Sequence, residues 1–169
     1  MNNFECEFCK KVFKYESNYL KHQCETMKRY ALLDTPKGRH SYLIFNQWRK
    51  LQKRPVLSVE AFIESRAFNA FNKFATFVRS RSIPNTTSYI QYMLSKTMPP
   101  TLWCNYDVYD SYIEHFDKTA TIDDKIQISL ETISDLCKTY KCNPAEIFEH
   151  IKPLQILTMV NSRKLSPWV

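Results

Sequence analysis

The chain has 169 residues, of which 44% are hydrophobic and 24% charged, and its formal net charge is +7. These values are typical of globular proteins and disfavour disorder, while the length is too short for two full domains and no apolar stretch approaches the roughly 20 residues of a membrane span, so we expect a soluble protein. Gly38 is the only glycine, and because hairpin turns require glycine, the composition favours a helical fold.

The first predicted element is a compact unit over residues 1–27. The opening MNNFECEFCKK carries charges where a signal peptide has its apolar region, so we expect no export by that route and reduced or metal-bound cysteines. Cys6 and Cys9 have two residues between them, and twelve more lead to His22. This is the first-half spacing of a conventional zinc finger. With Cys24 as fourth ligand, the unit is a CCHC-type zinc finger that binds structural Zn²⁺ and folds by doing so.

The last two ligands are closer together than in conventional fingers. Only Gln23 separates His22 from Cys24, whereas about three to five residues are usual. Side chains two positions apart on an α-helix point about 160° to 200° from each other. Either the helix ends or tightens at His22, or Cys24 is not the fourth ligand. Three thiolates and one imidazole leave zinc no open position, so we expect a structural staple or a module that itself contacts a partner; a zinc hydrolase would require an open site.

Residues 28–169 are predicted to form an all-helical domain. Thr35-Pro36 marks the start of a helix that runs to Pro55, and Ser58 caps an aromatic-rich helix that ends near residues 82–84. The many phenylalanines of this second helix predict burial on most of its surface and a central place in the core.

Further helices are predicted over residues 86–95 and 105–117. Thr121, with Asp124 three residues later, caps another helix, whose apolar stripe extends to Tyr140. Residues 143–146, Asn-Pro-Ala-Glu, favour one more helix start, and the tail after Pro153 is not assigned.

Two groups of residues suit contact with nucleic acid. In a DNA-reading finger, the base-facing positions counted back from the histidine are Tyr15, Asn18 and Lys21. A basic cluster beside Trp48 suits phosphate binding with aromatic stacking, or equally a solvated helix end with the indole in the core. The cluster consists of Arg49, Lys50, Lys53 and Arg54, with extensions at Lys28-Arg29, Lys37, Arg39, Arg79 and Arg81.

The charge is also unevenly distributed. Residues 1–100 hold 17 Lys and Arg against 7 Asp and Glu, whereas residues 101–169 hold 7 against 10. The front half therefore carries +10 and the back half −3, and a basic half suits a polyanionic partner.

The remaining candidate groups do not favour an enzyme. Cys137 and Cys142 have four residues between them and no spaced histidine, so they are interpreted as core or incidental thiols. The other histidines are isolated, and the chain has no phosphate loop, nucleophile motif or HExxH sequence.

Several segments together resemble a family of T4-like tailed phages. They are the CxxC…HxC unit, the basic turn CETMKRY, the aromatic segment AFIESRAFNAFNKFATFV and the closing CNPAEIFEHI. The chain is similar to the baseplate hub distal subunit family, whose members are linked to assembly of the tail baseplate hub. The resemblance implies a structural or assembly role in the phage. The composition and the residue spacing by themselves do not indicate such a role.

Two functions are therefore expected. The leading hypothesis is a non-enzymatic, zinc-stabilised phage protein that contacts other baseplate or tail proteins, located in the host cytoplasm during assembly or in the virion. The alternative is a nucleic-acid-binding zinc-finger protein acting in phage transcription, replication or packaging.

Overall fold

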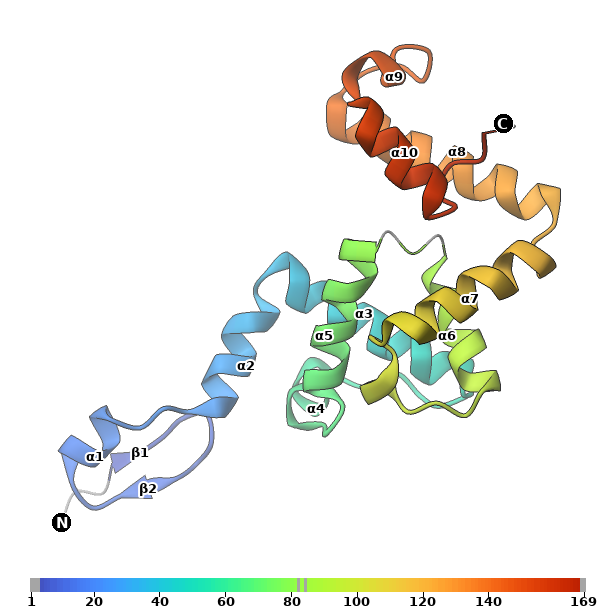
Figure 1. Cartoon of the computed structure of the whole chain (residues 1–169). Helices are drawn as coiled ribbons and strands as arrows, with labels where there is room; N and C mark the ends of the chain where they lie inside the picture. The colour runs from blue at the N-terminus through green and yellow to red at the C-terminus, as the bar shows by residue number, and fades with distance from the viewer. Residues whose placement is uncertain (1–3, 82, 84, 168–169) are drawn as a thin grey trace. The chain divides into compact units, whose positions relative to one another are not determined.

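The computed structural model describes residues 4–81, 83 and 85–167 (Figure 1). The chain forms two compact units, residues 1–75 and 76–169, and the division falls within helix α5. Helices make up most of the described chain, beside one two-stranded sheet. The predicted fold class, an all-helical protein with a small N-terminal zinc-finger-like unit, is confirmed. A domain boundary between residues 27 and 28 stays a prediction.

The N-terminal part of the first unit is a short hairpin followed by a one-turn helix. Strands β1 (Phe4–Glu5) and β2 (Val12–Phe13) are antiparallel, with Phe4 opposite Phe13, and α1 (Glu16–Leu20) follows (Figure 1). The ring of Tyr19 on α1 lies 6.1 Å from the ring of Phe4 and 6.0 Å from that of Phe13. Three aromatic rings therefore form the small core of this part.

Helices α2 (Glu25–Leu33) and α3 (Pro36–Leu51) approach each other very closely. The Thr35 hydroxyl caps α3 by accepting a hydrogen bond from the Gly38 backbone N–H, as the sequence predicts. A Cβ atom on Gly38 would lie 2.0 Å from the Leu32 carbonyl oxygen and 2.5 Å from the Leu33 Cα. The one glycine of the chain thus stands where the backbones of two helices meet.

The single aromatic helix predicted after Ser58 is in fact two helices, α4 (Val59–Glu64) and α5 (Phe68–Arg81). Ser65 between them is extended, with φ −66° and ψ 147°. The Arg29 guanidinium of α2 donates a hydrogen bond of 2.8 Å to the Ile63 carbonyl and lies 5.0 Å from the Phe68 ring. This hydrogen bond gives a partner to the Ile63 carbonyl, which the break between the two helices leaves without one. Of the predicted end at residues 82–84, Ser82 and Pro84 lie outside the described residues.

The core of the first unit is a cluster of phenylalanine rings. The Phe62 ring lies 4.6 Å from that of Phe45 and 5.1 Å from that of Phe68, and the ring of Phe71 on α5 lies 5.2 Å from Phe45. All four side chains are buried. The predicted burial of the aromatic segment is confirmed for these rings, although the chain achieves it with a break.

In the second unit, α6 (Thr86–Ser95), a 3₁₀ turn η1 (Pro100–Leu102) and α7 (Tyr106–Thr119) enclose the most buried side chains. The Trp103 indole donates to the Met98 carbonyl at 2.9 Å, and the Trp103 carbonyl accepts from the Tyr89 hydroxyl at 2.9 Å. The Tyr89 and Tyr112 rings pack edge to face at 4.8 Å. Aromatic residues thus form this core too, with their polar atoms hydrogen-bonded.

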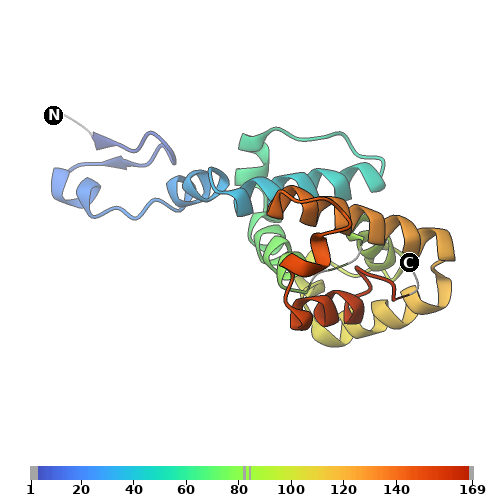
Figure 2. The ribbon, with the colours of Figure 1, turned by 90° about the horizontal axis from the view of Figure 1, so that it is seen from above.

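Helix α8 (Ile122–Tyr140) leads through the short α9 (Ile147–His150) to α10 (Pro153–Asn161) (Figure 2). The predicted cap of α8 by Thr121 and Asp124 is present as a reciprocal capping box. The helix start predicted at residues 143–146 is wrong, because these residues form a turn and the helix begins at Ile147. The unassigned tail contains α10, and Arg163 after it pairs with Asp117 of α7.

Candidate metal centre and surrounding surfaces

The four predicted metal ligands come together at the N-terminal hairpin. The ligand atoms of Cys6, Cys9, His22 and Cys24 all lie within 4.8 Å of one another, and the Cys9 Sγ lies 3.2 Å from the His22 Nε2. Around a tetrahedral zinc ion the sulfur atoms would be about 3.8 Å apart, since Zn–S bonds are about 2.3 Å. The cluster can therefore hold one metal ion with small side-chain adjustments.

The close spacing of His22 and Cys24 is possible because helix α1 ends before both residues. Helix α1 ends at Leu20, and Lys21 is its C-cap. Cys24 has φ −75° and ψ 111° and is the N-cap of α2, where its Sγ accepts a hydrogen bond of 3.4 Å from the Met27 backbone N–H. His22 and Cys24 therefore lie on either side of a helix boundary, and both point to the same site.

Backbone groups of the hairpin favour the ionised form of one thiol. Hydrogen bonds from the backbone N–H groups of Cys9 and Phe8 lower the pKa of Cys6 to about 6, against the opposing effect of burial. A bond from the Lys11 backbone N–H acts in the same direction on Cys9, yet burial and the neighbouring thiols of Cys6 and Cys24 raise the pKa of Cys9. A bound cation would favour the thiolate form of the ligands.

A shallow pocket of about 210 Å³ lies at the cluster and is lined in part by three of the four ligands, Cys6, His22 and Cys24. Its rim includes Phe8 from the Cys6–Cys9 turn, Leu20 from the end of α1 and Met27 from α2. These three apolar side chains are 42%, 74% and 44% exposed. The spacing of the ligands does not predict this surface, because only the folded hairpin brings the three residues together.

The predicted base-facing residues of the finger are all exposed. Tyr15 is the N-cap of α1 and is 59% exposed, and Asn18 and Lys21 are exposed on and just after the helix. Helix α1 has five residues. It spans little more than one turn, which is short for the major-groove helix of a conventional finger.

The basic cluster at the end of α3 is partly committed to the fold. The Arg49 Nε donates to the Pro55 carbonyl at 2.7 Å, and Trp48 packs 5.1 Å from the Phe71 ring. Lys50, Lys53 and Arg54 are exposed. Among the extensions, Arg29 binds the α4 carbonyl and the Arg81 guanidinium lies 3.9 Å over the Tyr106 ring, whereas Lys28, Arg39 and Arg79 are exposed. The surface available to phosphate is smaller than the sequence suggests.

The charge is also uneven between the two units. Residues 1–75 hold 14 Lys and Arg against 7 Asp and Glu, a net +7, whereas residues 76–169 hold 10 of each. The ion pair found among the described residues of the first unit joins Arg29 to Glu25 at 3.6 Å. All of the net charge of the chain therefore belongs to the unit that contains the metal cluster.

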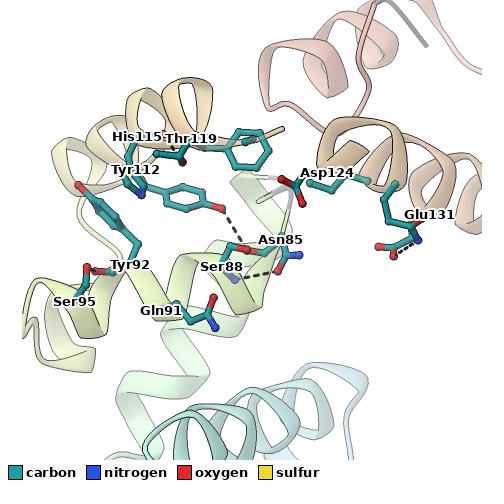
Figure 3. A pocket seen from close by; sticks show the side chains of 14 residues that line it. Asn85, Ser88, Gln91, Tyr92, Ser95, Tyr112, His115, Thr119, Asp124 and Glu131 are labelled. Carbon is teal, nitrogen blue, oxygen red and sulfur yellow. Dashed lines mark hydrogen bonds between the residues drawn. The ribbon is translucent and has the colours of Figure 1, made fainter. Parts of the chain in front are cut away.

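The second unit contains a polar pocket of about 410 Å³ between α6, α7 and α8 (Figure 3). The Tyr92 and His115 rings lie 4.9 Å apart, and the Tyr112 hydroxyl reaches the Asn85 carbonyl at 3.5 Å. Asp124 enters from α8, where its carboxylate completes the helix cap. The Tyr112 bond joins α7 to Asn85, the N-cap residue of α6, and the Asp124 bond completes the cap of α8.

Comparisons with protein-family models, with characterised proteins and with solved structures found no match to this chain. Within residues 4–81, 83 and 85–167, no helix is both long and apolar enough to cross a membrane.

Proposed function

We propose that this chain is a non-enzymatic interaction protein whose N-terminal unit is held together by structural Zn²⁺. Support comes from the donor set, because three thiolates and one imidazole suit zinc and fill a tetrahedral coordination sphere. Such a site stabilises a small fold and leaves no position for substrate or water.

We infer that the partner of this unit is a protein, and the exposed apolar side chains around the ligand cluster are the observation that carries this proposal. Phe8, Leu20 and Met27 expose apolar surface beside the ligands, which a partner protein can cover. Exposed groups of aromatic, Leu and Met side chains are typical of the centre of protein interfaces, where most binding energy is concentrated.

The proposed setting is assembly of a phage tail baseplate hub. This part of the proposal is based on the resemblance of the chain to the baseplate hub distal subunit family. Other tail proteins are then the expected partners.

Purification of the tagged full-length protein from phage-infected cells tests this function. Leu20→Ser removes the most exposed apolar group of the pocket, and Leu43→Ser is a matched control, because Leu43 on α3 is 64% exposed and lies outside the pocket. We expect tail proteins to co-purify with the wild type and with the control but not with Leu20→Ser, at equal zinc content. Recovery unaffected by Leu20→Ser would rule out this surface, and recovery of nucleic acid without tail proteins would refute the assembly role.

A second function, nucleic-acid binding, is favoured by the segregation of all net charge in residues 1–75. The exposed Lys50, Lys53 and Arg54 offer contacts to phosphate, and Tyr15, Asn18 and Lys21 offer contacts to bases or backbone. The affinity of such binding falls steeply with salt, because each neutralised phosphate releases counterions.

A salt titration of DNA binding separates the two functions. If Lys50, Lys53 and Arg54 contact phosphates, replacing all three by Gln lowers the slope of log affinity against log salt by up to about 3. The triple replacement of Lys96, Lys118 and Lys141 by Gln is the control, since Lys141 shares the left-handed backbone of Lys53. Absence of binding to duplex and single strands at low salt would eliminate this second function.

A further inference from the structure

Two cysteines of the second unit lie at the end of α8 and just after it. Cys137 is in the last turn of the helix, and Lys141, its C-cap, has the left-handed conformation with φ 55° and ψ 43°. The backbone N–H groups of Lys141 and Cys142 both donate to the Cys137 carbonyl, the latter at 3.2 Å. This is the Schellman type of helix ending, in which the chain turns back over its own last turn.

The Schellman geometry explains why the two thiols meet. It brings the side chain of the second residue after the helix against the side chain three positions before the helix end, and these positions are Cys142 and Cys137. Each of the two thiols is half-buried rather than enclosed. The four-residue spacing, which has no meaning for a zinc site, thus makes the two cysteines neighbours across this turn.

Neither metal binding nor nucleophilic catalysis accounts for this pair. In the described part of the chain, the one group of three or more metal-ligating side chains is that at Cys6. The ring of His150, the histidine of the adjoining α9, stacks on Tyr140 at 6.4 Å. Two adjacent, partly accessible thiols without a third ligand are suited to thiol–disulfide exchange.

We propose that Cys137 and Cys142 are a redox modification site. The two cysteines form an intramolecular disulfide by exchange with a small-molecule disulfide such as oxidised glutathione. One thiolate attacks the glutathione disulfide, forms a mixed disulfide and releases one reduced glutathione. The second cysteine then displaces the bound glutathione. In sum, the protein loses two protons and two electrons, and one glutathione disulfide becomes two thiols.

The disulfide would fix the end of α8 to the segment that follows it. Ile147 and Ile151 of that segment are buried, so the turn at Lys141 determines how the segment packs after α8. Burial and the neighbouring Cys137 raise the pKa of Cys142, which lowers the fraction of this thiol that is ionised at neutral pH.

Peptide mapping of the zinc-loaded, full-length protein after incubation with oxidised glutathione tests the proposal. We expect a peptide that links Cys137 to Cys142, with a mass decrease of about 2 Da for the two hydrogens lost. Because the second step is intramolecular, the mixed disulfide at this pair should be short-lived and the linked peptide should accumulate in its place, whereas any glutathione on Cys104 should persist. A Cys137→Ser or Cys142→Ser variant should instead retain glutathione on the remaining thiol.

Variants of the turn residue test the geometry without removing a thiol. Lys141→Gly preserves the left-handed turn and should retain disulfide formation, whereas Lys141→Val disfavours that conformation and should slow it. The proposal is overturned if the wild type accumulates only mixed disulfides, or if Cys137 and Cys142 link to other cysteines as readily as to each other. Equal rates in the two Lys141 variants would also contradict it.

Discussion

Cys24 has two roles that substitution can separate. It is a candidate metal ligand through its Sγ, and the same atom caps α2 by accepting a hydrogen bond from the Met27 N–H. Ser is a good N-cap but a poor zinc ligand, whereas Ala serves neither role. Cys24→Ser therefore removes metal binding and keeps the cap, and Cys24→Ala removes both.

The two roles differ in size. Loss of an N-cap costs about 1 kcal/mol, so without metal Cys24→Ala should be about 1 kcal/mol less stable than Cys24→Ser. Zinc at a free concentration one thousand times its Kd stabilises the folded state by about 4 kcal/mol. Both variants should lose this larger contribution. Cys24 is only 2% exposed, so water cannot replace the interactions that either substitution removes.

Zinc content and unfolding in urea, measured with and without zinc, give the two contributions. Cys142→Ser is the control, because it removes a thiol from the second unit and should retain one zinc per chain. NMR signals of Met27 and His22 report locally on the cap and on the ligand. If Cys24→Ser binds zinc with unchanged stoichiometry and affinity, Cys24 is not the fourth ligand and our account of the α1–α2 boundary is wrong.

Other substitutions test the helical units by urea unfolding. Gly38→Ala should lower the free energy of unfolding by about 3 kcal/mol or more, because the new Cβ would lie 2.0 Å and 2.5 Å from backbone atoms of α2. Backbone atoms cannot move aside as a flexible side chain can. A loss below 1 kcal/mol would show that the two helices are not in this contact. Phe62→Ala should cost about 3 to 5 kcal/mol through the cavity it leaves, since Phe62 is 0% exposed. Arg163 holds the pKa of Asp117 below its usual range through their hydrogen bond, so the pair stabilises the fold above the ordinary carboxyl pKa of about 4, and this contribution disappears as the pH falls through the lowered value. Arg163→Gln should therefore cost about 0.5 to 1 kcal/mol at pH 7, where both groups are partly exposed, and almost nothing at pH 2; an equal cost at both pH values would refute the role of the pair.

Local signals predicted the helix boundaries well where a cap decides them. Thr35, Ser58 and Thr121 each accept the hydrogen bond that their positions before a helical pattern predict. The prediction was wrong where a distant residue intervenes. The aromatic segment reads as one helix, yet it breaks at Ser65, because Arg29 of α2 binds the free Ile63 carbonyl and packs on Phe68.

The candidate metal site shows a similar division. Spacing alone indicated Cys6, Cys9 and His22 but left two alternatives for Cys24, since periodicity cannot say where a five-residue helix ends. The folded chain ends α1 early and caps α2 with Cys24, which brings the fourth ligand to the cluster. The proximity of Cys142 to Cys137 likewise depends on the left-handed turn at Lys141, which no pattern in the sequence reveals.

By itself, the sequence determined the helical class of this protein, its caps and the composition of its metal-binding unit, because these depend on neighbouring residues. Its single glycine was a sign of a helical composition. Only the tertiary structure decided why Gly38 is that glycine, where the aromatic segment breaks and which arginines remain free for a partner. These features depend on contacts between α2 and later helices, and contacts between residues distant in the chain leave no periodic trace in it.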